Sequence, residues 1–189
     1  MNYSLRTLLI VGVLAEIAIF VTAYALHPSM EEAFRFAARY SGRLSAAVFL
    51  SAFYLFAASY PAPVETNTNL RNRVSLFAVL HLIHFGFLAA NVYLNDIPLV
   101  PVKLTGGALA YLMIVAAPFY LHKANFKLQL TYFYYASLVM ILTYVARIKG
   151  DFQGADPFWF HYVMMGIFLV SCILFGWQMF QKSRKSIAG

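Results

Sequence analysis

Six long apolar stretches alternate with short polar segments along the chain. Each has about 17 to 23 residues, close to the length that an α-helix needs to cross a bilayer. Because lipid cannot hydrogen-bond a bare backbone, stretches of this length are expected to be helices. The pattern therefore predicts an all-α, polytopic six-helix transmembrane bundle with short loops, forming a single membrane domain over residues 1–189. The predicted spans are about 7–26, 44–60, 74–94, 104–121, 128–145 and 158–180.

The polar segment after the first stretch has the features of a helix start. Ser29 can cap the helix, and Glu32 follows three residues later, as a capping box requires. Aromatic residues then alternate with Arg35 and Arg39 up to Gly42. We expect a short helix over about residues 29–41 that lies in the membrane interface and ends at Gly42, with a solvated loop as the alternative.

Composition narrows the class of protein. Of the 189 residues, 62% are hydrophobic and 11% are charged, whereas soluble domains are about half apolar and about a quarter charged. A typical soluble enzyme, a disordered chain and a nucleic-acid-binding module are therefore excluded. Six spans place both termini on one side, and eight of the 14 basic residues fall there. We therefore expect a multi-pass inner-membrane protein in contact with lipid, with both termini cytoplasmic.

Few titratable residues lie deep within the predicted spans. Glu16 is ten residues after Arg6, and His84 is eleven residues after Arg73. At a rise of about 1.5 Å per residue, both lie at a similar depth near the midplane. Ionisable groups are costly in lipid, so they face the bundle interior and are functional candidates. Ala23-Tyr24-Ala25 resembles a signal-peptidase site, but the long stretch before it contains an acid, which favours a retained helix.

His81 and His84 are three residues apart and share one face of the third span. A neutral imidazole is a good ligand for iron, so one of them can bind a haem iron while the other makes a supporting hydrogen bond. The alternative is that both only hydrogen-bond a Tyr, a Ser or Glu16 inside the bundle. The remaining histidines lie at other depths, which argues against a histidine-rich di-iron centre. They are His27, His122 and His161.

The order of several short motifs resembles the ferric-reductase-like transmembrane domain superfamily. That superfamily includes the haem-b membrane subunit of the periplasmic methionine sulfoxide reductase system. The resemblance covers about residues 39–147, and it rests on the order and spacing of the motifs. These are Arg39-Tyr40-Ser41-Gly42-Arg43-Leu44-Ser45-Ala46, Leu70-Arg71-Asn72-Arg73-Val74-Ser75-Leu76-Phe77-Ala78 before His81 and His84, Lys103-Leu104-Thr105-Gly106-Gly107-Ala108, and Phe126-Lys127-Leu128.

The resemblance implies a bundle that holds b-type haem between the third and fifth spans. Such a bundle moves electrons to or from quinone, flavin or iron. The histidine of the family's third span corresponds to His84 or, one turn earlier, to His81. Arg71 and Arg73 match arginines at the start of that span, and they are expected to pair with haem propionates.

The chain departs from the family in its fifth span. The family has histidines there, at positions that correspond to about Leu130 and Thr143, and this chain has none in that span. Ligation of haem by two histidines from the third and fifth spans is therefore excluded. His161 is the only other histidine within a span, and it is expected to lie roughly 10 Å in depth from His84.

Two hypotheses of function follow. The first is a divergent haem-b electron-transfer subunit, with His84 or His81 as a ligand and a sixth ligand that is not a histidine, is absent or comes from a partner. It would pass electrons between a quinone or flavin donor and a partner protein, with Glu16 handling a proton of the quinone chemistry. We expect no room for a flavin domain in 189 residues, so it would be an oxidoreductase subunit rather than a complete enzyme. The second is a non-haem structural or assembly subunit, or a small carrier, with the same bundle.

Overall fold

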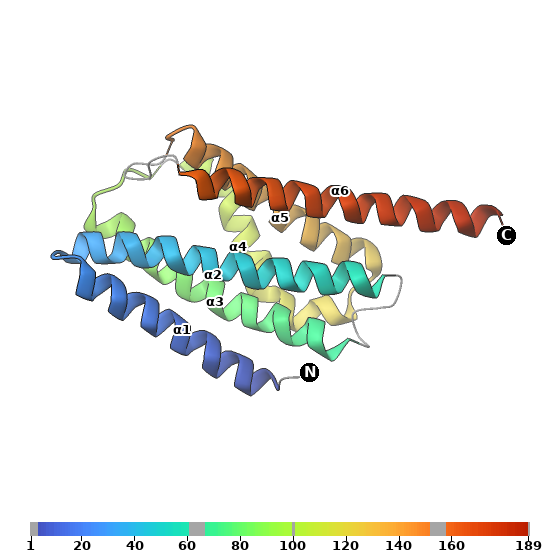
Figure 1. The fold of residues 1–189 in the computed structure, drawn as a ribbon, viewed down its shortest axis with the longest axis horizontal. Helices are drawn as coiled ribbons and strands as arrows, with labels where there is room; N and C mark the ends of the chain where they lie inside the picture. Colours follow the sequence, from blue (N-terminus) through green and yellow to red (C-terminus); the bar gives the residue numbers. More distant parts are fainter. Residues whose placement is uncertain (1–3, 61–66, 100, 152–157, 189) are drawn as a thin grey trace. The chain divides into compact units, whose positions relative to one another are not determined.

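The described part of the chain consists of six long helices. The computed structural model describes residues 4–60, 67–99, 101–151 and 158–188. All six helices are long and apolar enough to cross a membrane, which confirms the predicted all-α fold. The helices, shown in Figure 1, are α1 (Leu5–Leu26), α2 (Met30–Ser59), α3 (Thr68–Leu94), α4 (Pro101–Tyr120), α5 (Phe126–Ile148) and α6 (Trp159–Ala188), with a single 3-10 turn, η2 (Leu121–Lys123), before α5.

The chain forms two compact units. The first unit, Met1–Gln129, holds α1 to α4, and the second unit, Leu130–Gly189, holds most of α5 and all of α6. In the second unit the Tyr134 hydroxyl donates a hydrogen bond to the Cys172 carbonyl oxygen at 2.9 Å, and the Tyr134 ring contacts the Phe175 ring. An aromatic hydroxyl thus joins α5 to α6 inside the apolar segment, where water does not compete for the bond.

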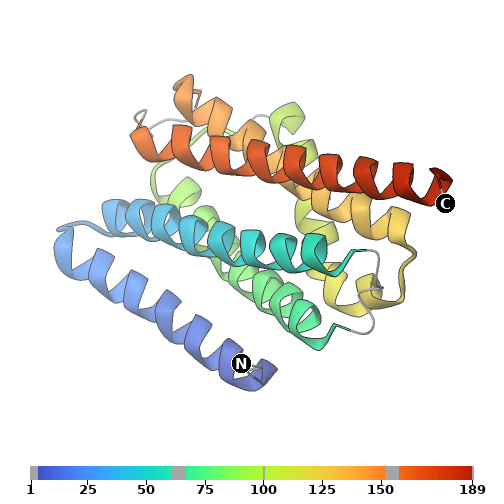
Figure 2. The same ribbon diagram turned by 45° about the vertical axis from the view of Figure 1, so that its right-hand side comes forward.

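Within the first unit, α1, α2 and α3 lie side by side (Figures 1 and 2). Near the end of α1, the Phe20 ring lies 5.1 Å from the Phe34 ring of α2 and 5.6 Å from the Phe87 ring of α3. Further back along α1, Gly12 is buried against Leu76 and Leu80 of α3, and a Cβ added there would lie 2.8 Å from Leu76. A small residue on α1 thus allows the close helix approach that is typical of membrane interfaces.

The start of α2 agrees with the sequence prediction, but its length does not. The Ser29 hydroxyl caps the helix by accepting a hydrogen bond from the Glu32 backbone N–H at 3.3 Å. The expected helix over residues 29–41 does not end at Gly42, because α2 continues without a break to Ser59. The prediction of a separate short helix was therefore wrong. Glycine often marks a helix end, but Gly42 instead lies where α2 closely approaches α3.

The Ser29 cap gives a direct test of how α2 is held at its start. Replacing Ser29 by alanine removes the acceptor for a backbone N–H of the first turn and should cost about 1 kcal/mol of stability. We expect the Ser29→Ala variant, purified in detergent, to melt at a lower temperature when followed by circular dichroism. Ser29→Asp, which retains a capping oxygen, should melt like the wild type. Equal melting of the alanine variant and the wild type would show that the cap contributes no stability.

Candidate functional site

The candidate site lies on the interface between α2 and α3, where the two helices run antiparallel and contact each other over their whole length. Polar and aromatic pairs follow one another along this interface in register. Because the register is regular, each residue of one helix lies opposite a fixed position on the other. From one end to the other the pairs are Glu31 with Asn95, Gly42 with His84, Ser45 with His81, Phe49 with Phe77, Ser51 with Arg73, and Ser59 with Asn67.

His81 is held by a short hydrogen bond to α2. Its Nδ1 atom lies 2.7 Å from the Oγ atom of Ser45, and Ser45 is fully buried. The imidazole ring stacks on the Tyr111 ring of α4, with 4.5 Å between the ring centroids. One nitrogen and one face of the ring are thus fixed by two neighbouring helices. When Nδ1–H donates to Ser45, the lone pair of Nε2 is available for a metal or for another donor.

His84 lies one level away along the same interface. A Cβ atom added to Gly42 would lie 2.9 Å from Cε1 and 3.3 Å from Nε2 of the His84 ring. The ring therefore occupies the space that any other residue at position 42 would fill. The centroids of the His81 and His84 rings are 5.5 Å apart, so the two histidines share a face as predicted. His81 hydrogen-bonds Ser45. A serine partner is also what the alternative predicts, in which the two histidines only form hydrogen bonds inside the bundle.

The two arginines at the start of α3 have different surroundings. The Nη1 atom of Arg73 donates to the Ser51 hydroxyl of α2 at 2.9 Å, while Arg71 is exposed. Arg73 thus faces the same interface as Ser45 and His81, about 12 Å along α3 from His81. Of the two residues expected to pair with haem propionates, Arg73 is the one with a hydrogen bond to α2 across this interface.

Glu16 is a buried acid among the described residues of the first unit. Its side chain is 2% exposed, and the Ser41 hydroxyl of α2 faces its carboxyl group. Ser41 and Gly42 are neighbours in the sequence, and Gly42 contacts His84. Glu16 and His84 therefore lie near the same level of α2, in agreement with the similar depth expected from their positions in α1 and α3.

His161 belongs to the second unit and lies in the first turn of α6. Its side chain is 7% exposed, and its Nδ1 atom accepts a hydrogen bond from the Phe158 backbone N–H at 3.3 Å. This contact satisfies one of the backbone N–H groups at the start of a helix. In the second unit its ring also lies 6.2 Å from that of Tyr144. The nitrogen Nδ1 of His161 thus has a structural role at the first turn of α6.

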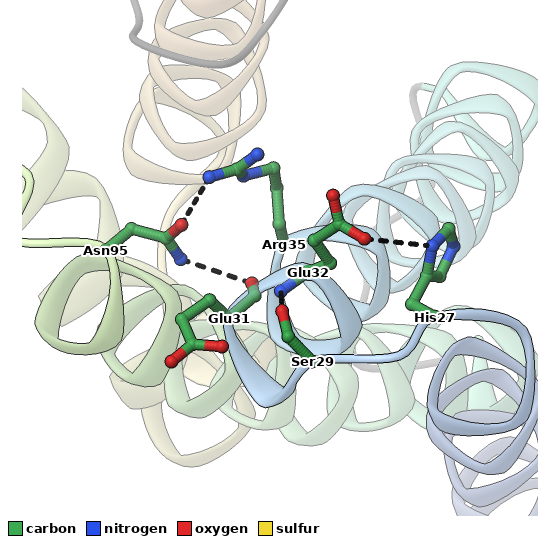
Figure 3. A network of polar contacts seen from close by, with 6 residues as sticks. All are labelled: His27, Ser29, Glu31, Glu32, Arg35 and Asn95. Carbon is green, nitrogen blue, oxygen red and sulfur yellow. Dashed lines mark hydrogen bonds and ion pairs between the residues drawn. The ribbon is translucent and has the colours of Figure 1, made fainter.

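A second polar cluster joins the start of α2 to the end of α3, and sequence reasoning did not find it. Figure 3 shows the Asn95 side chain between the two helices, where its amide nitrogen donates to the Glu31 carbonyl oxygen at 3.1 Å. Its amide oxygen accepts a hydrogen bond from the Arg35 guanidinium group. Nearby, the His27 ring stacks on the Phe36 ring at 3.7 Å, and its Nδ1 atom lies 3.8 Å from the Glu32 carboxylate. The cluster fixes the register of α2 against α3.

His81 has one feature that a histidine ligand of a haem iron needs, a hydrogen bond at its other ring nitrogen. Within the described residues no group of three His, Cys, Asp or Glu side chains could hold a bare metal ion. A haem brings four ring nitrogens of its own, so it needs only one histidine from the protein to be anchored. Histidines that bind metals almost always donate their other ring N–H to a partner. His81, with Ser45 at its Nδ1 atom, has this arrangement.

No protein-family model, curated protein or solved structure matches this chain. Its function is therefore inferred from the contacts of the α2–α3 interface and from the ionisable residues in the first unit.

Proposed function

We propose that this integral membrane protein is a haem-b electron-transfer subunit of an inner-membrane complex, with His81 as the residue that would hold the haem iron. A bound haem supplies one-electron chemistry, so the subunit would pass electrons between a quinone or flavin donor and a partner protein. The observation that carries the proposal is the 2.7 Å hydrogen bond between Ser45 and Nδ1 of His81. That bond would set the tautomer and direction of the ring and leave Nε2 to the iron.

The surroundings of His81 support the proposal in a second way. The ring lies among the aromatic side chains of Phe77 and Tyr111, with centroid distances of 5.1 Å and 4.5 Å. An apolar, aromatic shell limits the access of water and helps to set a redox potential. Arg73, hydrogen-bonded to Ser51 on the same interface, is the cation we assign to a haem propionate.

The absorption spectrum of the purified protein tests this function. We expect a Soret band, together with sharpened visible bands after reduction with dithionite and a b-type haem in a pyridine haemochrome assay. The protein should be expressed with haem synthesis intact and purified in mild detergent, so that loss of cofactor during preparation is avoided. A protein that has no Soret band, and that gains none when haemin is added, would refute the proposal.

The second candidate is a non-haem structural or assembly subunit with the same bundle. The close packing of His84 against Gly42 and the hydrogen bond of His81 to Ser45 favour it, because both contacts use a histidine to join two helices. In that case both histidines would stabilise the α2–α3 pair without binding iron. The haemin addition separates the candidates, since a structural subunit would gain neither a Soret band nor thermal stability from it.

A further inference from the structure

The carboxyl group of Glu16 is buried in the first unit and forms no hydrogen bond. The side chain is 2% exposed, and neither of its oxygen atoms has a hydrogen-bond partner. Ser41 is fully buried, and its hydroxyl faces this carboxyl but also lacks a hydrogen bond of good geometry. Two buried polar groups on adjacent helices thus point to a common ligand, because an unsatisfied group in a membrane interior is costly.

Apolar contacts close this site along α1 on both sides. One turn beyond Glu16, the Phe20 ring packs against Phe34 and Phe87. One turn before it, Gly12 lies directly against the side chains of Leu76 and Leu80. These two sets of contacts, the Phe20 rings and the leucines at Gly12, join α1 to the helices beside it. The ligand is therefore a small one, and the closure favours a proton over a quinone ring.

The groups that face Glu16 do not include a cation paired with it. From α2 the facing group is the neutral Ser41 hydroxyl, and the next residue, Gly42, has no side chain. From α3 the titratable residue at this level is His84, whose ring lies on Gly42. Within the described residues, no Arg, Lys or His forms an ion pair with Glu16. An ionised carboxylate in this position would be buried without compensation, which costs several kcal/mol or more.

We propose that Glu16 and Ser41 form a proton-binding site in the membrane interior. The Glu16 carboxyl group holds the proton, and the Ser41 Oγ atom is the acceptor for its O–H group. The contacts of Phe20 and of Gly12 flank the site on both sides along α1, so it is a candidate for stepwise proton transfer. It consists of residues of α1 and α2, and it does not depend on haem.

Carbodiimide labelling of the full chain in proteoliposomes tests this proposal. Dicyclohexylcarbodiimide is apolar and reacts with protonated carboxyl groups, so we expect an adduct on Glu16 at neutral pH, located by mass spectrometry of peptides. The yield should fall as the pH is raised. A water-soluble carbodiimide should modify the exposed Glu31 and leave Glu16 unmodified. If Glu16 stays unmodified by the apolar reagent and the infrared spectrum also lacks the carbonyl band of a protonated carboxylic acid, the proposal is overturned.

Two variants separate proton binding from a general effect on folding. Glu16→Gln is neutral and similar in shape, so we expect it to fold, to melt at the wild-type temperature and to give no adduct at this position. In infrared spectra, the carbonyl stretch of a protonated carboxylic acid should be present in the wild type and lost in Glu16→Gln. If the band is the same in both proteins, Glu16 does not hold the proton. The adduct should also form in His81→Ala, so failure of the haem proposal leaves this result unchanged.

Discussion

Replacing His81 by alanine should leave the purified protein without haem, because it removes the one residue that we assign to the haem iron. The expected result is loss of the Soret band and of the pyridine haemochrome signal, at an expression level similar to that of the wild type. His84→Ala should retain the cofactor, since the His84 ring packs on Gly42 and is not assigned to the iron. The pair of variants therefore distinguishes two histidines that lie on one helix face with ring centroids 5.5 Å apart.

The controls for this prediction come from the same interface. Ser45→Ala removes the hydrogen-bond partner of His81, and losses of this kind cost about 10- to 100-fold in metal affinity. Ser45→Thr keeps a hydroxyl group and should restore binding. Ser59→Ala removes a serine of α2 that bonds to Asn67 at the far end of the interface, and it should leave the affinity at the iron unchanged. Loss of haem in His84→Ala, together with its retention in His81→Ala, would transfer the ligand assignment to His84.

The sequence was sufficient to predict the fold, because span number follows from the length and composition of each apolar stretch. It also placed Glu16 and His84 at similar depth, since a straight helix has a constant rise per residue. Both predictions depend only on positions along single helices and not on contacts between helices. The observed level of both residues along α2, at Ser41 and Gly42, agrees with this expectation.

Contacts between helices could not be obtained in this way. The pairing of Ser45 with His81 depends on the register of α2 against α3, and neither helix encodes that register alone. Asn95 lies at a helix end, where a polar residue has no distinctive pattern, and its role became clear only from its contact with Glu31. Gly42 was misinterpreted because a glycine that stops a helix and a glycine that admits a neighbouring side chain have the same sequence signature.

The second large effect is expected for Gly42→Ala, because Gly42 leaves space for a side chain of the neighbouring helix rather than ending α2. An added Cβ would lie 2.9 Å from Cε1 of His84, which is closer than a normal contact, so the imidazole ring or the helix must move. Overpacking of this kind costs about 1–3 kcal/mol, and the gain in helix propensity, at most about 1 kcal/mol, offsets only part of it. We expect a lower melting temperature in detergent and, in the haem-bound protein, a changed Soret position as the neighbouring His81 is displaced.

Gly86 of α3 offers a matched control, because an added Cβ there would meet no atom within 4 Å. Gly86→Ala gains the same helix propensity without a clash, so it should be neutral or slightly stabilising. The Gly42→Ala, His84→Ala double variant removes the ring that the new methyl group would meet, and it should recover part of the lost stability relative to Gly42→Ala alone. If both glycine variants melt alike and the double variant recovers nothing, the close approach of α2 to His84 is not what requires glycine at position 42. A recovery would instead show that this one small residue sets the distance between the two helices that carry the candidate haem site.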